Sequence, residues 1–134
     1  MAIEQTSVGL RITVSLPYSD AVEKTVAALK TEGFGVLTTI DVKQTMREKL
    51  GEEYRPYIIL GACNPPLAHR ALSTTPEVGL LLPCNVVVYE AEGGCVVSAM
   101  DPTSAMQMVS HPELEAVAKE VRAKLERVLQ QVAG

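Results

Sequence analysis

Two cysteine–asparagine pairs carry the side chains with the clearest capacity for chemistry. Cys63 and Asn64 directly precede a proline, and Cys84 and Asn85 directly follow one. Paired thiols can bind a soft metal or exchange electrons, and the start of a helix can bind an anion or lower the pKa of a nearby thiol. Because binding groups are usually placed where regular elements end, these four residues are our candidate ligand-binding residues.

Each pair also has a purely structural interpretation. Asn64 can cap a helix that begins at Pro65, and a buried cysteine can act as a small apolar side chain. The thiols of Cys63 and Cys84 are 21 residues apart and do not form a CxxC motif. No further pair of ligands completes a four-coordinate zinc site, so the two thiols are weak metal candidates. The sequence assigns no catalytic residue and identifies no cofactor.

Aromatic residues are scarce, at 4% of the chain, and there is no tryptophan. So few rings argue against a base-stacking platform, and a net charge of −4 argues against binding to a phosphate backbone. We therefore expect no nucleic-acid partner. Two of the rings, Tyr57 and Tyr89, flank the two cysteine–asparagine segments and are candidate walls of a ligand pocket.

Hydrophobic periodicity predicts the elements that position these residues. Residues 8–16 alternate apolar and polar side chains, which is typical of a half-buried strand. Asp20 and Glu23 form the pattern of a capping box at the start of the next helix. The remaining elements of the first half are a strand at 35–40, a short helix at 41–50, a strand at 57–60 and a helix from Asn64 to about residue 72.

The second half of the chain predicts a hairpin followed by helices. Residues 78–82 are apolar, Pro83 interrupts them, and a β-branched strand resumes at 86–89. A turn at 92–94 then leads into a strand at 95–100 and a short helix at 101–109. The final helix follows a capping box at Ser110 and Glu113, and its apolar stripe is formed by Leu114, Val117, Val121, Leu125, Val128 and Val132.

This element order, β-α-β-α-β-α-β-β-α-α, predicts an α+β fold. The hairpin excludes an all-parallel sheet, so we expect a two-layer sandwich with a mainly antiparallel sheet of about five strands and helices on one face. The length predicts a single domain over residues 1–134. No segment is apolar enough to span a membrane, and residues 1–6 lack the features of a signal peptide. We therefore expect a cytoplasmic chain with reduced thiols and no membrane partner.

The same segments resemble a known family, the domain of unknown function 302 family. The resemblance spans roughly residues 7–132 and rests on four sequence segments: Ile59-Leu-Gly-Ala-Cys-Asn-Pro65, Leu80-Leu-Leu-Pro-Cys-Asn-Val-Val-Val-Tyr-Glu90, Gly33-Phe-Gly-Val-Leu37 and Ile40-Asp-Val-Lys43. It implies a compact single-domain α+β fold, often dimeric, in bacteria and archaea. It implies no established activity.

Three functional hypotheses follow. The first is a small homodimeric binding module that holds a small molecule, an anion or a soft metal near Cys63, Asn64, Cys84 and Asn85. The second is an enzyme or redox protein that uses a Cys63 thiolate at a helix N-terminus. The third is a structural homodimer without a ligand, formed through a sheet face.

Overall fold

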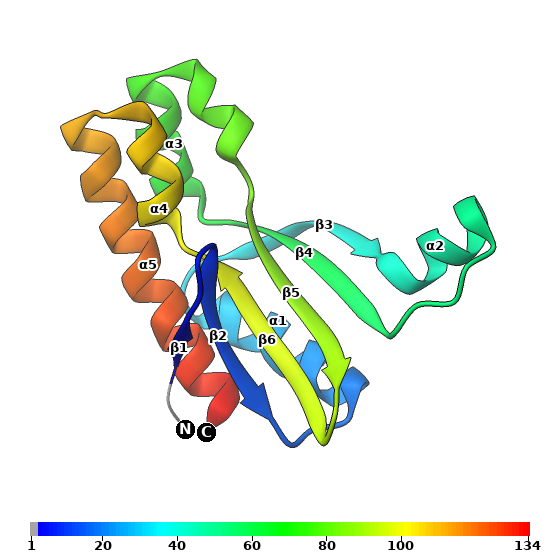
Figure 1. Cartoon of the computed structure of the whole chain (residues 1–134). Helices are drawn as coiled ribbons and strands as arrows, with labels where there is room; N and C mark the ends of the chain where they lie inside the picture. The colour runs from blue at the N-terminus through cyan, green and yellow to red at the C-terminus, as the bar shows by residue number, and fades with distance from the viewer. Residues whose placement is uncertain (1–2) are drawn as a thin grey trace.

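The computed structural model describes residues 3–134 and has an α+β fold. Met1 and Ala2 lie outside the described residues. They belong to the segment 1–6, which we do not expect to be a signal peptide. The six strands form one antiparallel sheet in the order β1-β2-β6-β5-β4-β3 (Figure 1). The strands are β1 (Glu4–Gln5), β2 (Gly9–Val14), β3 (Gly35–Asp41), β4 (Tyr57–Cys63), β5 (Cys84–Ala91) and β6 (Gly94–Met100).

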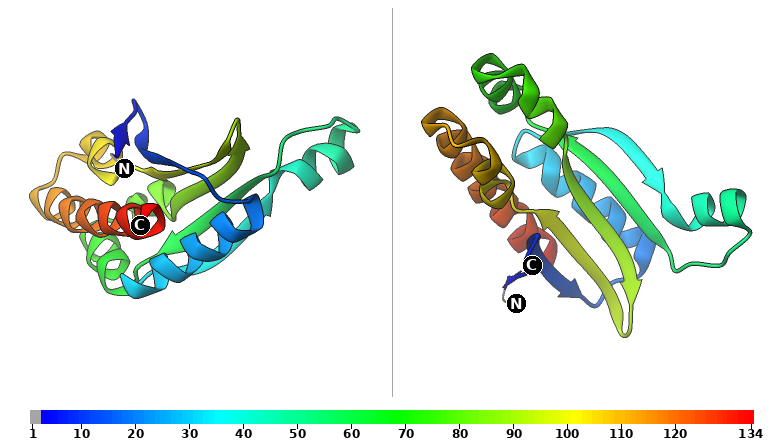
Figure 2. Two further views of the ribbon diagram at one scale, coloured as in Figure 1. Left: turned by 90° about the horizontal axis from the view of Figure 1, so that it is seen from below. Right: turned by 45° about the horizontal axis from the view of Figure 1, so that its top comes forward.

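Two helices, α1 (Tyr18–Thr31) and α5 (Pro112–Ala133), pack against one face of this sheet (Figure 2). The shorter helices α3 (Pro65–Thr74) and α4 (Pro102–Met106) pack on α5. The predicted stripe of α5 is buried along its whole length, from Leu114 to Val132, because it packs on α1, α3, α4 and β2. Alternation along β2 likewise buries Leu10, Ile12 and Val14, so the aliphatic core sits between the sheet and α1 and α5.

One additional strand and two helix starts differ from the sequence prediction. The short strand β1 is additional, and α1 begins at Tyr18 after Pro17 instead of at Asp20. The last helix is capped by His111, whose Nδ1 accepts a hydrogen bond from the backbone N–H of Glu113 at 3.1 Å. The predicted cap Ser110 lies one residue too early, because the imidazole nitrogen takes the role of the hydroxyl oxygen.

The apolar run before Pro83 is also not a strand. It forms the 3-10 helix η1 (Pro76–Leu81), and Thr75 caps this helix by accepting a hydrogen bond from the N–H of Glu77. Val78 is buried whereas Leu80 is 83% exposed, so the run does not have one continuous buried face. Pro83 has no N–H to donate to a ladder, and β5 begins at the residue after it.

The helix α2 (Val42–Leu50) lies apart from the other helices (Figure 1). It stands away from the body at the end of β3 and β4 (Figures 1 and 2), and none of its residues is buried. Asp41 caps it as predicted, since its carboxylate accepts a hydrogen bond from the N–H of Gln44 at 3.0 Å. The apolar side chains of Val42, Met46 and Leu50 are therefore not part of the buried core.

Within residues 3–134, no helix has both the length and the apolar character needed to cross a membrane.

Candidate ligand-binding pocket

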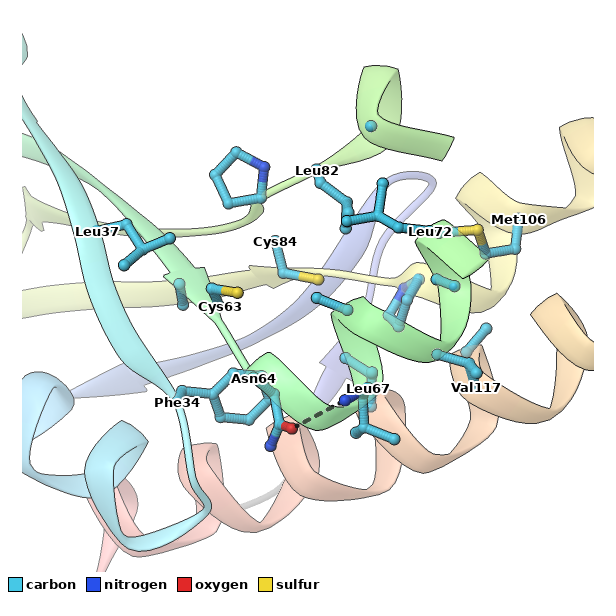
Figure 3. A pocket seen from close by; sticks show the side chains of 18 of the residues that line it. Phe34, Leu37, Cys63, Asn64, Leu67, Leu72, Leu82, Cys84, Met106 and Val117 are labelled. Carbon is cyan, nitrogen blue, oxygen red and sulfur yellow. Dashed lines mark hydrogen bonds between the residues drawn. The ribbon is translucent and has the colours of Figure 1, made fainter. Parts of the chain in front are cut away.

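An apolar pocket of about 360 Å³ opens where β4 and β5 meet α3. Its walls come from the sheet, from α3, from α5 and from the segment that joins η1 to β5 (Figure 3). Most of the side chains that line it are aliphatic or aromatic, including Phe34, Leu37, Leu67, Leu72, Leu82, Met106 and Val117. A cavity of this size falls at the lower end of the range of small-molecule sites, roughly 300–1,000 Å³.

Both candidate thiols line this pocket. Cys63 ends β4 and Cys84 begins β5, and these two strands are hydrogen-bonded neighbours in which Ala62 is paired with Cys84. Figure 3 shows the two side chains next to each other, with both sulfur atoms turned toward the space beside α3. The structure therefore brings together two thiols that are separated by 21 residues in the sequence.

The two thiols differ in their environments. Cys63 is partly exposed, whereas Cys84 is only 7% exposed and sits against the core. Burial raises the pKa of the Cys84 thiol to about 11, and the nearby Cys63 contributes a smaller increase in the same direction. Cys84 is therefore a protonated, apolar part of the wall at neutral pH.

Asn64 lines the pocket, but its polar atoms are already used by the fold. Its side-chain oxygen accepts a hydrogen bond from the N–H of Leu67 at 3.4 Å, which caps α3 as the sequence predicts. Its side-chain nitrogen donates to the carbonyl oxygen of Glu32 at 3.2 Å, which joins the start of α3 to the end of α1. Asn64 thus positions the wall, and one of its two amide N–H donors is already used by the fold.

The start of α3 is unsuited to binding an anion. Pro65 and Pro66 have no N–H group, the N–H of Leu67 is bonded to the Asn64 side chain, and the N–H of Ala68 is bonded to the Asn64 carbonyl. The free donors that give helix N-termini their anion affinity are therefore absent or occupied. No charged side chain lines the pocket within the described residues, so the structure gives the anion hypothesis no support.

The other three candidate residues lie on the opposite face of the sheet. Asn85, Tyr57 and Tyr89 line a separate shallow hollow, together with parts of β2 and β6. The physical reason is strand alternation: Asn85 follows Cys84 and so points the other way, and Tyr57 and Tyr89 share its face. The two tyrosines therefore line this second hollow and not the pocket beside the thiols.

The two tyrosines instead pack on each other. Their rings stack with centroids 5.1 Å apart and an interplanar angle of 6°. They are directly paired across β4 and β5, and burial raises the pKa of Tyr57, with Tyr89 adding to this shift. Such a cross-strand aromatic pair stabilises the sheet without any ligand.

Sequence reasoning missed the helical half of the pocket. Ala68 and Ala71 of α3 and Ala118 of α5 line it, and their small side chains leave the space that larger residues would fill. The only available signal was this run of alanines on the apolar faces of two helices. That signal is not specific, because alanine is also the best helix-forming residue.

Comparisons with known proteins place this geometry in a family. The sequence model described as "Domain of unknown function DUF302" matches residues 10–132. A crystal structure of an uncharacterized conserved protein DUF302 from Bacillus stearothermophilus has 32% sequence identity and a TM-score of 0.87, and the match covers 94% of this chain and 98% of that chain. No match is found among curated proteins.

Proposed function

The chain belongs to the DUF302 family, and we propose that it is a single-domain binding module whose ligand occupies the pocket beside Cys63, Asn64 and Cys84. The observation that carries this proposal is an open pocket of about 360 Å³ with an almost entirely apolar lining. Protein interiors are close-packed, and contact between apolar surface and water is unfavourable. Displacement of water from such a pocket by an apolar molecule is therefore favourable in free energy.

The lining favours a neutral small molecule over the other ligands considered. A charged group would lose its hydration without gaining an ion pair, because no charged side chain lines the pocket. The described residues contain no group of three or more histidine, cysteine or acidic side chains, so a structural zinc site has no support. The two sulfur atoms can contact a neutral ligand as soft, polarisable groups.

A fluorescent probe tests this proposal. The neutral dye N-phenyl-1-naphthylamine should bind the reduced protein with a saturable rise in fluorescence and a stoichiometry of one per chain. Ala68→Leu places a larger side chain in the pocket and should weaken the affinity at least tenfold. Ala123→Leu, the same change at an exposed position of α5, should leave the affinity unchanged. Non-saturable binding, or equal affinity in the two variants, would contradict the proposal.

The geometry gives less support to a thiol-dependent enzyme. Reactive thiols are activated by free helix N–H groups or by basic side chains nearby. The four N–H positions at the start of α3 are missing or occupied, and the residues that line the pocket include no lysine, arginine or histidine. Binding is therefore the better-supported use of this site.

We also propose that the chain acts as a homodimer. An exposed apolar surface supports this proposal. The arm, which we define as β3, α2 and the residues up to Arg55, leaves an apolar surface uncovered: Ile40 is 47% exposed and Leu50 is 67% exposed. A nine-residue helix is marginal in water unless its apolar side packs on something. The strand β3 is also an unprotected sheet edge of seven residues without proline.

A second copy of the chain suits this surface, because antiparallel pairing of the same edge strand is self-complementary about a twofold axis. Light scattering should give the mass of a dimer for the wild type. The double substitution Ile40→Lys and Leu50→Lys should give a monomer. Val8→Lys is the matched control, because Val8 is 74% exposed but lies near the opposite edge of the sheet. A monomeric wild type, or a double variant that remains dimeric, would exclude the arm as the interface.

A further inference from the structure

We infer that Cys63 and Cys84 are a disulfide-competent pair, which converts reversibly between two thiols and one disulfide in the wall of the pocket. This inference goes beyond ligand binding and does not depend on it. It rests on the placement of the two residues in the sheet, on their different exposure and on the isolation of the third cysteine.

The register of the sheet places the two residues within reach. Ala62 is paired with Cys84, so Cys63 is one residue beyond the direct partner of Cys84. A strand spacing of about 4.8 Å and a rise of about 3.3 Å per residue put the two Cα atoms on the order of 6 Å apart, within the range of about 4.4–6.8 Å seen for disulfides. Formation of the bond therefore requires no separation or sliding of the strands.

The direction of the side chains is the second requirement. Strict alternation would turn Cys63 away from the face that carries Ala62. At this end of β4, however, the side chain of Cys63 lines the same pocket as Cys84, and the two thiols lie side by side in Figure 3. Cys63 also contributes to the raised pKa of Cys84, which indicates that the two groups are close enough to interact electrostatically.

The third cysteine is separated from this pair. Cys95 is the second residue of β6, beside the β5–β6 hairpin, and is paired with Val14 and Glu90, at the far end of β5 from Cys84. Its sulfur donates to the carbonyl oxygen of Leu16 at 3.4 Å. The inference therefore specifies one pairing among three cysteines.

The exchange reaction assigns different roles to the two thiols. The partly exposed Cys63 loses its proton and attacks one sulfur of a small disulfide, which forms a mixed disulfide and releases one small thiolate. The Cys84 sulfur, after losing its proton, attacks the Cys63 sulfur and releases the second small thiolate. In total the protein gives up two electrons and two protons, and the small disulfide is reduced to two thiols. Because the pKa of Cys84 is raised, the second step should accelerate with increasing pH.

The test uses a Cys95→Ser variant, which keeps only Cys63 and Cys84. After incubation with oxidised glutathione, we expect the free thiol count to fall from two per chain to none. The intact mass should decrease by two hydrogens, without a glutathione adduct, and dithiothreitol should restore both thiols. The double variant Cys63→Ser, Cys95→Ser should instead keep its thiol or carry a glutathione adduct. Thermal unfolding confirms that each variant is folded, and Cys63→Ala replaces Cys63→Ser if the hydroxyl destabilises the fold.

Several outcomes would overturn the inference. These are a stable glutathione adduct on the Cys95→Ser variant, a disulfide between two chains, or two thiols that persist at pH 9. Probe binding is measured separately on the reduced protein. Loss of probe binding with an intact disulfide reaction therefore contradicts only the proposed function, and the reverse result contradicts only the disulfide.

Discussion

Cys84 is the residue where burial changes chemistry most clearly. Its burial against the core, and to a smaller extent Cys63 on β4, disfavours the thiolate and raises the pKa of Cys84 to about 11. This shift links the stability of the fold to pH, because the unfolded chain exposes the same thiol to water. The thiol also has a structural role, since it fills part of the wall between β5 and α3.

Stability should therefore decrease at alkaline pH. Above about pH 8.5 the unfolded thiol loses its proton while the folded one retains it, so the folded state binds more protons. The free energy of unfolding should fall by about 1.4 kcal/mol per pH unit from this group as the pH rises toward 11. Urea unfolding of wild type and Cys84→Ala from pH 7 to 10, under reducing conditions, measures the difference. Parallel pH curves for the two proteins would contradict the prediction.

At the scale of elements, Asn64 connects β4, α3 and α1. It directly follows β4, caps α3 and donates a hydrogen bond to the Glu32 carbonyl at the end of α1. Glycine at position 33 allows this close approach, since its φ of 83° is in the left-handed region and a Cβ there would lie 3.1 Å from the Asn64 side-chain nitrogen. The cap is therefore also an anchor between two helices.

Substitution of Asn64 should separate these two roles. Asn64→Ala removes both hydrogen bonds and should destabilise the protein by about 2 kcal/mol, at the upper end for loss of a cap. Asn64→Asp retains an acceptor for the N–H of Leu67 but has no amide donor for the Glu32 carbonyl. Its effect should lie between those of wild type and alanine in chemical denaturation. Equal stability of the aspartate and wild-type proteins would show that the Glu32 contact contributes nothing.

At the scale of the whole molecule, an ion pair with a buried carboxylate joins the residue after β6 to the last helix. Asp101 is 1% exposed, and its carboxylate accepts a hydrogen bond from the Arg122 guanidinium of α5 at 2.7 Å. It also accepts hydrogen bonds from the N–H and hydroxyl of Thr103. Arg122 extends this network to the side chain of Gln5 in β1, so the first strand, the end of β6 and the last helix meet there.

Removal of the arginine should therefore affect global stability. Arg122→Met leaves the Asp101 carboxylate buried without its cation and should lower the free energy of unfolding by about 3 kcal/mol. Arg127→Met on the same helix breaks a more exposed ion pair with Glu32 and should cost about 1 kcal/mol or less. Urea denaturation of the two variants at pH 7 provides the comparison. If Arg122→Met lowered the free energy of unfolding less than Arg127→Met does, the stabilising role given to the Asp101–Arg122 pair would be wrong.

Local patterns predicted most of the elements correctly. The caps Asp41, Asn64 and Asp101 and the hairpin after β5 are present as expected, because each depends on neighbours within a few residues. The prediction failed in two different ways. The apolar run at 78–82 forms η1 because tertiary packing gives its side chains no common buried face: Val78 is buried and Leu80 is exposed. The start of α5 failed locally, since His111 takes the capping role expected of Ser110.

The sequence by itself determined the aliphatic character of the protein, the α+β order and the two cysteine–asparagine segments, because these depend on composition and local periodicity. Only the tertiary structure decided which of the candidate residues meet. The register between β4 and β5 brings Cys63 and Cys84 to one pocket, whereas alternation sends Asn85 and the Tyr57–Tyr89 pair to the other face. The pairing of strands distant in sequence sets that register. The small side chains of α3 and α5 set the volume of the pocket.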